Sequence, residues 1–148
     1  MTRFRRIVCA SDFSRTSGRA LSAAIGLAKA SRARLTILHD YVPIVPLVPE
    51  QYIDSSTFER VDTETRKWVE HKVARLADKA RRAGVRASAL LVTGDPSQQI
   101  IRVARKQRAD LIVVGTHGRR GFSKFFLGSV AERVVATAPC PVLTIRGR

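Results

Sequence analysis

Residues 111–118 of the 148-residue chain read Leu-Ile-Val-Val-Gly-Thr-His-Gly. Four consecutive apolar residues are typical of a strand that is buried on both faces of a sheet. The glycines that follow the run predict a loop rather than a continued strand. Because strands buried on both faces occur almost only in parallel sheets covered by helices, this stretch predicts an α/β fold.

Apolar strand patterns alternate with helical patterns along the rest of the chain. Strands are expected at residues 4–10, 34–41, 86–93, 111–114 and 142–145. Helical spacing of apolar residues lies between the strands, ending near residues 30, 83, 107 and 137. The predicted fold class is therefore a Rossmann-like, open parallel sheet of five strands with helices on both faces. The length suits one domain that spans residues 1–148.

Capping signals predict where several helices begin and end. Ser56–Glu59 and Ser129–Glu132 both have a serine followed by glutamate three residues later, the pattern of a capping box. Asp95–Gln98 predicts an N-cap aspartate with proline in the first helical position. Gly84 predicts the end of the long helix that opens at Ser56. Trp68 lies on the apolar stripe of that helix and is expected in the core.

The charge is the unusual feature of the composition. The chain has 27 Lys and Arg against 12 Asp and Glu, a formal charge of +15. This balance favours an anionic partner, namely nucleic acid, a phosphorylated small molecule or an acidic surface, but it also fits a merely solvated arginine-rich surface. The two cysteines have no CxxC spacing, and no apolar run approaches the ~20 residues of a membrane span. A cytoplasmic protein without a disulfide framework is expected.

Ligands of open α/β sheets bind beyond the carboxyl ends of the strands. The loop after residue 114 is the richest of these ends, since it contains four glycines with Arg119, Arg120 and Lys124. Gly128-Ser129 stands at the start of a helix, where unpaired amides and the helix dipole favour phosphate oxygens. The loop matches neither the GxxxxGK[ST] nor the GxGxxG phosphate-binding pattern.

Catalytic and metal-binding signals are weak. The sequence shows no nucleophile–base–acid set and no paired carboxylates in one loop, so no catalytic residue is predicted. His39, His71 and His117 are not spaced as metal ligands, and no metal site is predicted. Cys9 and Cys140 are expected to pack as small apolar side chains.

The spacing Gly115-x-x-Gly118, nine residues, then Gly128-Ser129 resembles the ATP-binding signature of the universal stress protein family. The resemblance covers nearly the whole chain and includes Ile7–Ser14, Gly94–Pro96 and Pro139–Leu143. It implies the sheet order 3-2-1-4-5, with ATP, bound with or without Mg²⁺, across the ends of strands one and four. It also implies a homodimer formed through the last strand, Val142 to Ile145, whose unpaired edge invites pairing.

The same resemblance implies which residues touch the nucleotide. Asp12 and the backbone around Ala10 would face adenine and ribose, Gly115 and Gly118 the ribose and phosphates, and residues 128–130 the triphosphate. The full set of expected nucleotide-binding residues is Ala10, Asp12, Asp40, Gly115, Gly118, Arg119, Gly128, Ser129 and Val130.

Asp40 departs from the family pattern, because ATP-binding members commonly have an aliphatic residue at this position. A carboxylate beside the apolar face of a base costs desolvation energy unless it accepts a hydrogen bond, for instance from the adenine amino group.

The function implied is a nucleotide-dependent stress-response or signalling module that hydrolyses ATP slowly or not at all. Residues 42–55 would form a lid, since this long loop leaves the ligand end of strand two. A rival hypothesis is a dimeric interaction protein with a vestigial site, whose basic surface binds acidic partners or nucleic acid. Specific single-strand recognition is not favoured, because aromatic residues are not interleaved with the basic ones.

Overall fold

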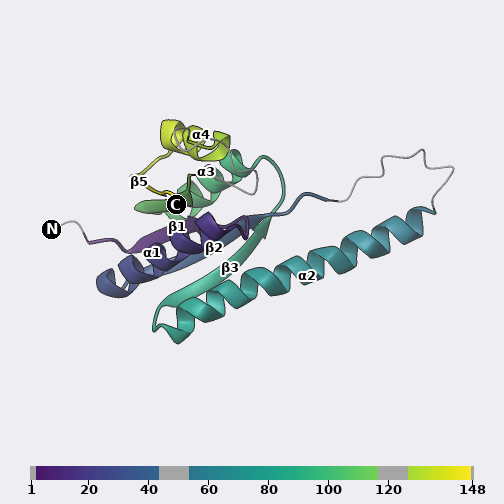
Figure 1. The fold of residues 1–148 in the computed structure, drawn as a ribbon, viewed down its shortest axis with the longest axis horizontal. Helices are drawn as coiled ribbons and strands as arrows, with labels where there is room; N and C mark the ends of the chain where they lie inside the picture. The colour runs from purple at the N-terminus through teal and green to yellow at the C-terminus, as the bar shows by residue number, and fades with distance from the viewer. Residues whose placement is uncertain (1–2, 44–53, 117–126, 148) are drawn as a thin grey trace.

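The computed structural model describes residues 3–43, 54–116 and 127–147. Strands and helices alternate along them, and the five strands form one parallel sheet in the order β3-β2-β1-β4-β5 (Figure 1). This confirms both the predicted fold class and the implied strand order. The elements are β1 (Arg6–Ala10), α1 (Arg15–Ser31), β2 (Arg34–Asp40), α2 (Ser55–Arg82), β3 (Arg86–Val92), α3 (Pro96–Gln107), β4 (Leu111–Gly115), α4 (Ser129–Thr137) and β5 (Val142–Ile145).

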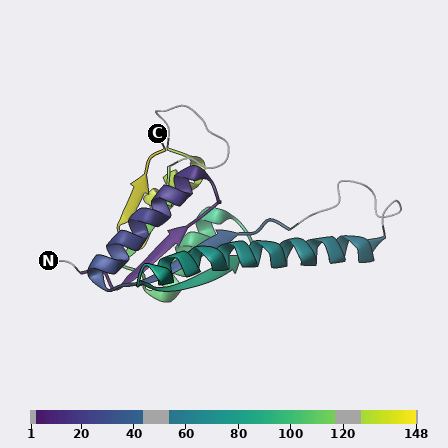
Figure 2. The same ribbon diagram turned by 60° about the horizontal axis from the view of Figure 1, so that its bottom comes forward.

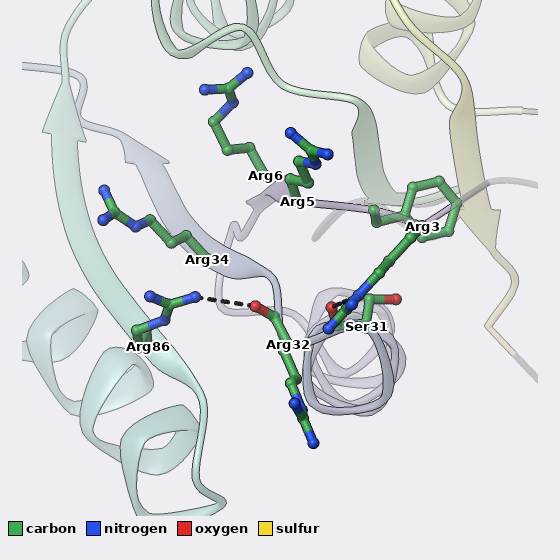
Figure 3. A pocket seen from close by; sticks show the side chains of 8 residues that line it. Arg3, Arg5, Arg6, Ser31, Arg32, Arg34 and Arg86 are labelled. Carbon is green, nitrogen blue, oxygen red and sulfur yellow. Dashed lines mark hydrogen bonds between the residues drawn. The ribbon is translucent and has the colours of Figure 1, made fainter.

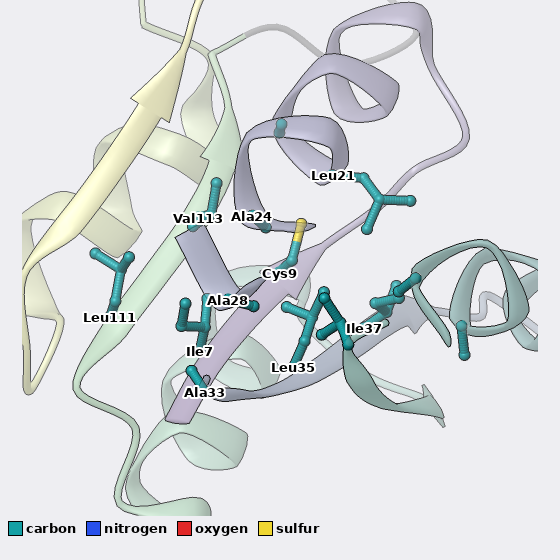
Figure 4. Packing of buried hydrophobic residues seen from close by; sticks show 14 residues of the cluster. Ile7, Cys9, Leu21, Ala24, Ala28, Ala33, Leu35, Ile37, Leu111 and Val113 are labelled. Atoms are coloured by element: carbon teal, nitrogen blue, oxygen red, sulfur yellow. The ribbon is translucent and has the colours of Figure 1, made fainter. Parts of the chain in front are cut away.

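Successive residues of the central strands bury their side chains on opposite faces of the sheet. On one face, Ile7, Ile37 and Val113 pack against alanines and Leu21 of α1 and against α2 (Figure 4). On the other face, Val8 and Ile112 pack against α3 and α4. Both faces are therefore covered by helices, as the uninterrupted apolar run of β4 predicts.

Cys9 lies in the first of these two cores and has no solvent exposure. Burial raises the pKa of its thiol to about 12, because the interior disfavours the charged thiolate. Cys140 is half-buried and packs against the second core. Both cysteines are therefore packing residues, which confirms the expectation from the sequence.

Two predicted helix ends are confirmed. The Asp95 carboxylate accepts a hydrogen bond of 3.0 Å from the backbone N–H of Gln98, and Pro96 is the first residue of α3. Gly84 follows α2 with a φ of +85°, the left-handed conformation that glycine adopts without strain. By contrast, the C-cap residues that follow α1 and α3 are arginines in the left-handed conformation: Arg32 has a φ of 55° and Arg108 a φ of 50°.

The start of α2 was predicted wrongly at Ser56. The helix begins at Ser55, and the N-cap is Asp54, whose carboxylate accepts from the backbone N–H of Ser56. Aspartate caps a helix at least as well as serine does. The helix therefore begins after the earlier of the two candidate caps, which is Asp54.

Trp68 is 57% exposed, which corrects the prediction that it lies in the core. The cause is length: α2 has 28 residues and extends about 42 Å, whereas the seven residues of β2 or β3 span about 23 Å. The amino-terminal half of α2 projects beyond the sheet (Figures 1 and 2). Its buried residues start only at Val69 and continue with Val73, Ala77 and Ala80. The apolar stripe is real, but the sheet lies under only its second half.

Candidate functional site

The strand order places the topological switch point between β1 and β4. The chain leaves β1 for α1, on the face covered by α1 and α2, and leaves β4 for α4, on the opposite face. In such folds the crevice beyond the carboxyl ends of these two strands is the ligand site. The register Cys9 with Val113 brings Ala10 beside the end of β4, where Gly115 lies. The structure thus brings the ends of β1 and β4, predicted as the site, next to each other.

Asp12 organises the turn that follows β1. Its carboxylate accepts from the backbone N–H of Ser14 at 2.9 Å, and the Ser14 hydroxyl in turn caps α1 by accepting from Ser17 N–H at 3.1 Å. Burial by itself would raise the pKa of Asp12, but hydrogen bonds from Ser14 and Ser17 outweigh it and lower the pKa. Asp12 is therefore an ionised carboxylate held in the turn at the carboxyl end of β1.

His39 and Phe13 form a contact that sequence reasoning missed. His39 Nδ1 lies 2.7 Å from the backbone oxygen of Ser11, and the His39 ring lies 4.3 Å from the Phe13 ring, centroid to centroid. The ammonium group of Lys72 lies over both Phe13 and Trp68, at 4.3 and 4.5 Å from the ring centroids. Trp68 and Lys72 are one helical turn apart on α2, and that spacing was the available signal. These contacts of Lys72 with Phe13 and Trp68 hold α2 against the turn that follows β1.

Asp40 ends β2 and is the most unusual group at this end of the sheet. Both of its carboxylate oxygens are buried and have no hydrogen-bond partner among the described residues. Burial raises the pKa of Asp40 to about 6, repulsion from Asp95 adds to the rise, and the nearby amide of Gly94 opposes it. The amide of Gly94 lies close enough to affect this carboxylate but makes no hydrogen bond of standard geometry with it, so Asp40 can accept from a further donor.

Tyr41 fixes α2 to the end of β2. Its hydroxyl donates to the Asp62 carboxylate at 2.6 Å, and its backbone N–H donates to the carbonyl of Val92 at 2.7 Å. Burial, followed by the hydrogen bond and charge of Asp62, raises the pKa of Tyr41 to about 12. The neutral, donating phenol is thus the form present near neutral pH. These bonds hold the chain next to Asp40 in place.

The start of α4 differs from the predicted capping box. Gly128 is the N-cap, with φ −62° and ψ 150°, and Ser129 is the first helical residue, so no side chain caps the helix. Gly128 is anchored to the end of β4, because its N–H donates to the carbonyl of Thr116 at 2.5 Å. The amides of Ser129, Val130 and Ala131 have no hydrogen-bond partner in the part of the chain that the structure describes. Three donors at a helix N-terminus are therefore available beside the crevice.

Gly115 has a packing reason of its own. A Cβ atom at Gly115 would lie 2.9 Å from Thr16 Cγ2 and 3.3 Å from the Ser17 nitrogen. Neither Gly115 nor Gly128 has a positive φ, so left-handed backbone freedom does not explain these two glycines.

Two sets of predicted residues lie outside the described residues. Gly118 and Arg119 belong to the segment 117–126, as does His117. The predicted lid, 42–55, falls mostly within the undescribed segment 44–53. Within the described ranges, no group of three or more His, Cys, Asp or Glu side chains could hold a metal ion. Helices long and apolar enough to cross a membrane are likewise absent from these ranges.

The fold and the crevice define a doubly wound α/β protein with open helix-start amides at its switch point. The sequence profile of the Universal stress protein family matches residues 3–146. The "Universal stress protein in QAH/OAS sulfhydrylase 3′region" of Thermus aquaticus is 37% identical over 144 residues, covering 97% of this chain and 99% of the relative. The chain therefore belongs to the universal stress protein family.

Solved structures agree with this assignment. The hypothetical protein MJ0577 superposes with a TM-score of 0.82 at 22% identity, with 99% of each chain covered, and shows the shared fold. A universal stress protein solved in complex with cAMP superposes with a TM-score of 0.68 at 25% identity and covers 98% of each chain.

Proposed function

We propose that this universal stress protein binds ATP, with or without Mg²⁺, in the crevice between the carboxyl ends of β1 and β4. In this role it would serve in the cytoplasm as a nucleotide-dependent stress-response or signalling module. The observation that carries the proposal is the start of α4. There, three backbone amides without partners among the described residues sit beside the end of β4, at the switch point of the sheet.

Helix-start amides favour a phosphate group for two reasons. They supply hydrogen-bond donors that the helix itself cannot use, and the helix dipole adds about half a positive charge at the same end. Ser129, in the first helical position and exposed, adds a hydroxyl that is not consumed in capping. Gly128, Ser129 and Val130 are accordingly assigned to the triphosphate, together with Gly118 and Arg119 of the preceding loop.

Asp40 supplies the argument for adenine. Its buried carboxylate lacks a hydrogen-bond partner among the described residues, and the adenine amino group is a donor that would satisfy it. Guanine and hypoxanthine present an acceptor oxygen at the corresponding ring position, which would face the carboxylate unfavourably. Asp40 therefore selects adenine, while Asp12, Ala10 and Gly115 border the ribose.

The relatives support a nucleotide without fixing which one. The universal stress protein solved with cAMP is 25% identical to this chain over nearly its full length, and cAMP contains the same adenine base. The open α4 amides extend the preference from the base to the phosphates. Hydrolysis is slow or absent in this proposal.

A homodimer through β5 completes the proposal. β5 is the edge strand of the sheet, and among the described residues it pairs only with β4. Its unpaired edge can accept the same strand of a second copy, and the exposed Val130 and Val135 of the adjoining α4 add apolar surface.

Calorimetric titration of the purified protein with Mg-ATP tests the nucleotide proposal. We expect saturable binding of one ATP per chain, with a dissociation constant below millimolar. Absence of heat at millimolar ATP, in a preparation shown to contain no co-purified nucleotide, would remove it. A preparation that releases adenine nucleotide on denaturation supports it independently.

A further inference from the structure

We propose that the amino end of the sheet, opposite the crevice, binds a compact anion that carries two or more adjacent phosphate groups. This inference does not depend on ATP binding, because it uses none of the residues assigned to the nucleotide. It concerns a cavity and a cluster of arginines that the nucleotide proposal leaves unexplained.

A cavity of about 770 Å³ lies at this end of the sheet. Its volume falls within the ~300–1,000 Å³ that is usual for small-molecule sites. No carboxylate lines it, and its charged lining consists of Arg3, Arg5, Arg6, Arg32, Arg34 and Arg86 (Figure 3). The residues come from the start of the chain, the end of α1 and the first residues of three strands, so the fold itself assembles the cluster.

Three of these arginines form a row across the sheet. Arg6 of β1 is the register partner of Arg34 of β2, which is in turn the register partner of Arg86 of β3. Neighbouring strands lie ~4.8 Å apart, so the three Cα atoms span only about 10 Å. Like charges placed side by side on a sheet destabilise it. A bound anion would remove this repulsion.

The charges of the cluster are not neutralised by the described part of the chain. The ion pairs among the described residues lie elsewhere in the fold and involve no arginine of the cluster: Arg66–Glu70, Arg81–Asp78 and Arg133–Asp95. The carboxylate of Asp110 accepts hydrogen bonds from the backbone amides of Arg5 and Arg6, at 2.8 and 3.2 Å. Asp110 therefore orders the start of β1 rather than pairing with a guanidinium.

Helix ends explain only some of the arginines. Arg3 and Arg86 donate to the carbonyls of Ser31 and Arg32 at the end of α1, at 3.0 and 3.1 Å. Arg6 donates to the carbonyl of Arg108 at the end of α3, at 2.9 Å. At both helix ends a positive charge also favours the helix dipole. The side chains of Arg5 and Arg34 make no hydrogen bond within the described ranges. Arg32 itself holds a left-handed φ of 55°, at which glycine would be less strained.

The composition of the cavity indicates the chemistry of its ligand. Each phosphate group brings about −1.5 to −2 charges at pH 7, and the planar fork of arginine matches its oxygens in pairs. A ligand that carries several phosphate groups in a small volume therefore matches the six guanidinium groups better than a ligand with a single carboxylate does. The one aromatic lining residue, Phe4, packs against the hydrophobic core, so it offers no stacking platform for bases. The cavity therefore fits a small polyphosphorylated molecule rather than a nucleic-acid strand.

Calorimetric titration of the purified protein with inorganic tripolyphosphate tests this site, and variants of cavity arginines that leave every crevice residue unchanged separate it from the crevice. We expect the double variant Arg34→Gln/Arg86→Gln to bind tripolyphosphate at least tenfold more weakly than the unchanged protein. The control is Arg60→Gln/Arg102→Gln, which removes the same net charge at two exposed arginines outside the cavity and should change affinity less than twofold. If the glutamine variant does not fold, Arg34→Lys/Arg86→Lys replaces it, and loss of the paired hydrogen bonds should still weaken binding severalfold.

Equal weakening in the cavity and control variants would show only a net-charge effect and would overturn the proposal. So would absence of binding at millimolar tripolyphosphate. Tripolyphosphate binding that neither the cavity variants nor the control variant weakens would place the ligand in the crevice instead and would also overturn the proposal. If a single-stranded oligonucleotide binds as tightly as tripolyphosphate, with the same dependence on Arg34 and Arg86, the cavity binds nucleic acid and the proposal of a compact anion is overturned.

Discussion

Thr16 of α1 packs directly against Gly115 of β4, so closely that a Cβ atom on the glycine would lie 2.9 Å from the threonine methyl carbon. The first glycine of the family's signature thus permits the start of α1 to approach the end of β4. This contact sets the position of the turn that holds Asp12. The glycine shapes the crevice whether or not its backbone touches a ligand.

Gly115→Ala should destabilise the protein by about 1–3 kcal/mol, the usual cost of overpacking. The added methyl would meet Thr16 Cγ2 and the backbone nitrogen of Ser17, and the backbone cannot move aside. Urea unfolding measures the effect. Adding Thr16→Ser, which removes the methyl carbon in the way, should restore part of the loss. A Gly115→Ala protein with unchanged stability would contradict the packing account.

Asp40→Asn should stabilise the ligand-free protein at pH 7.5 and leave it unchanged near pH 3.5. Folding raises the pKa of Asp40 from 3.8 to about 6, so the folded state holds this proton more tightly than the unfolded state. The stability that Asp40 contributes is therefore fully present below pH 3.8 and lost as the pH rises through about 6. After allowance for solvent screening, we expect a gain of roughly 1 kcal/mol. The measurement is urea unfolding at a series of pH values, and parallel pH profiles for both proteins would count against it.

Asp40 should also decide base preference. We expect ATP to bind at least tenfold more tightly than ITP, since a wrongly faced acceptor pair costs about 1–3 kcal/mol. In Asp40→Asn the preference should shrink, because an amide can donate to the hypoxanthine oxygen as well as accept from adenine. Competition titrations at pH 7.5 provide the ratio. Equal discrimination by both proteins would show that Asp40 does not contact the base.

The outer edge of β5 predicts how the proposed dimer can be split. The carbonyls of Pro141 and Ile145 bond to β4, so the backbone of the alternate residues Val142 and Thr144 faces outward. Thr144→Pro removes an outward donor while the bonds to β4 remain, as proline on an edge strand allows. Sedimentation equilibrium should find the unchanged protein dimeric and the variant monomeric at micromolar concentration. If the unchanged protein and the Thr144→Pro variant are both dimeric, the interface does not involve the edge of β5.

Hydrophobic patterning was sufficient to predict the fold class, whereas the strand order was implied by the family resemblance. The unbroken apolar run of β4 and the alternation of strands with helices predict a parallel sheet covered on both faces, which the structure confirms. Local signals were less reliable wherever two candidates competed. Asp54 precedes Ser56 as the cap of α2, and Gly128 precedes Ser129 as the cap of α4.

Features that depend on contacts between distant segments could not be predicted from sequence. The exposure of Trp68 depends on how far α2 extends beyond the sheet. The row Arg6–Arg34–Arg86 depends on the register of three strands. The burial of both carboxylate oxygens of Asp40 likewise depends on contacts that the pattern of one strand does not encode. Pattern reasoning could only mark Asp40 as unusual for its position.

In the proposed site the backbone amides at the start of α4 bind the triphosphate. Ser129→Pro tests it most directly. Proline is favoured in the first position of a helix, and the extended conformation of Gly128, φ −62° and ψ 150°, is one that a residue before proline adopts. The variant should therefore fold with unchanged or slightly higher stability while lacking the Ser129 amide donor and its hydroxyl. Ser129→Ala, which lacks the hydroxyl alone, is the matched control.

Mg-ATP titration of these two variants beside the unchanged protein is the decisive measurement. A hydrogen bond to a charged group contributes about 1.5–3 kcal/mol, so Ser129→Pro should lower ATP affinity roughly tenfold to a hundredfold. Ser129→Ala should lower it by less. A stable, folded Ser129→Pro protein that binds ATP as tightly as the unchanged protein would contradict the account, because the Ser129 amide would then contribute nothing to phosphate binding.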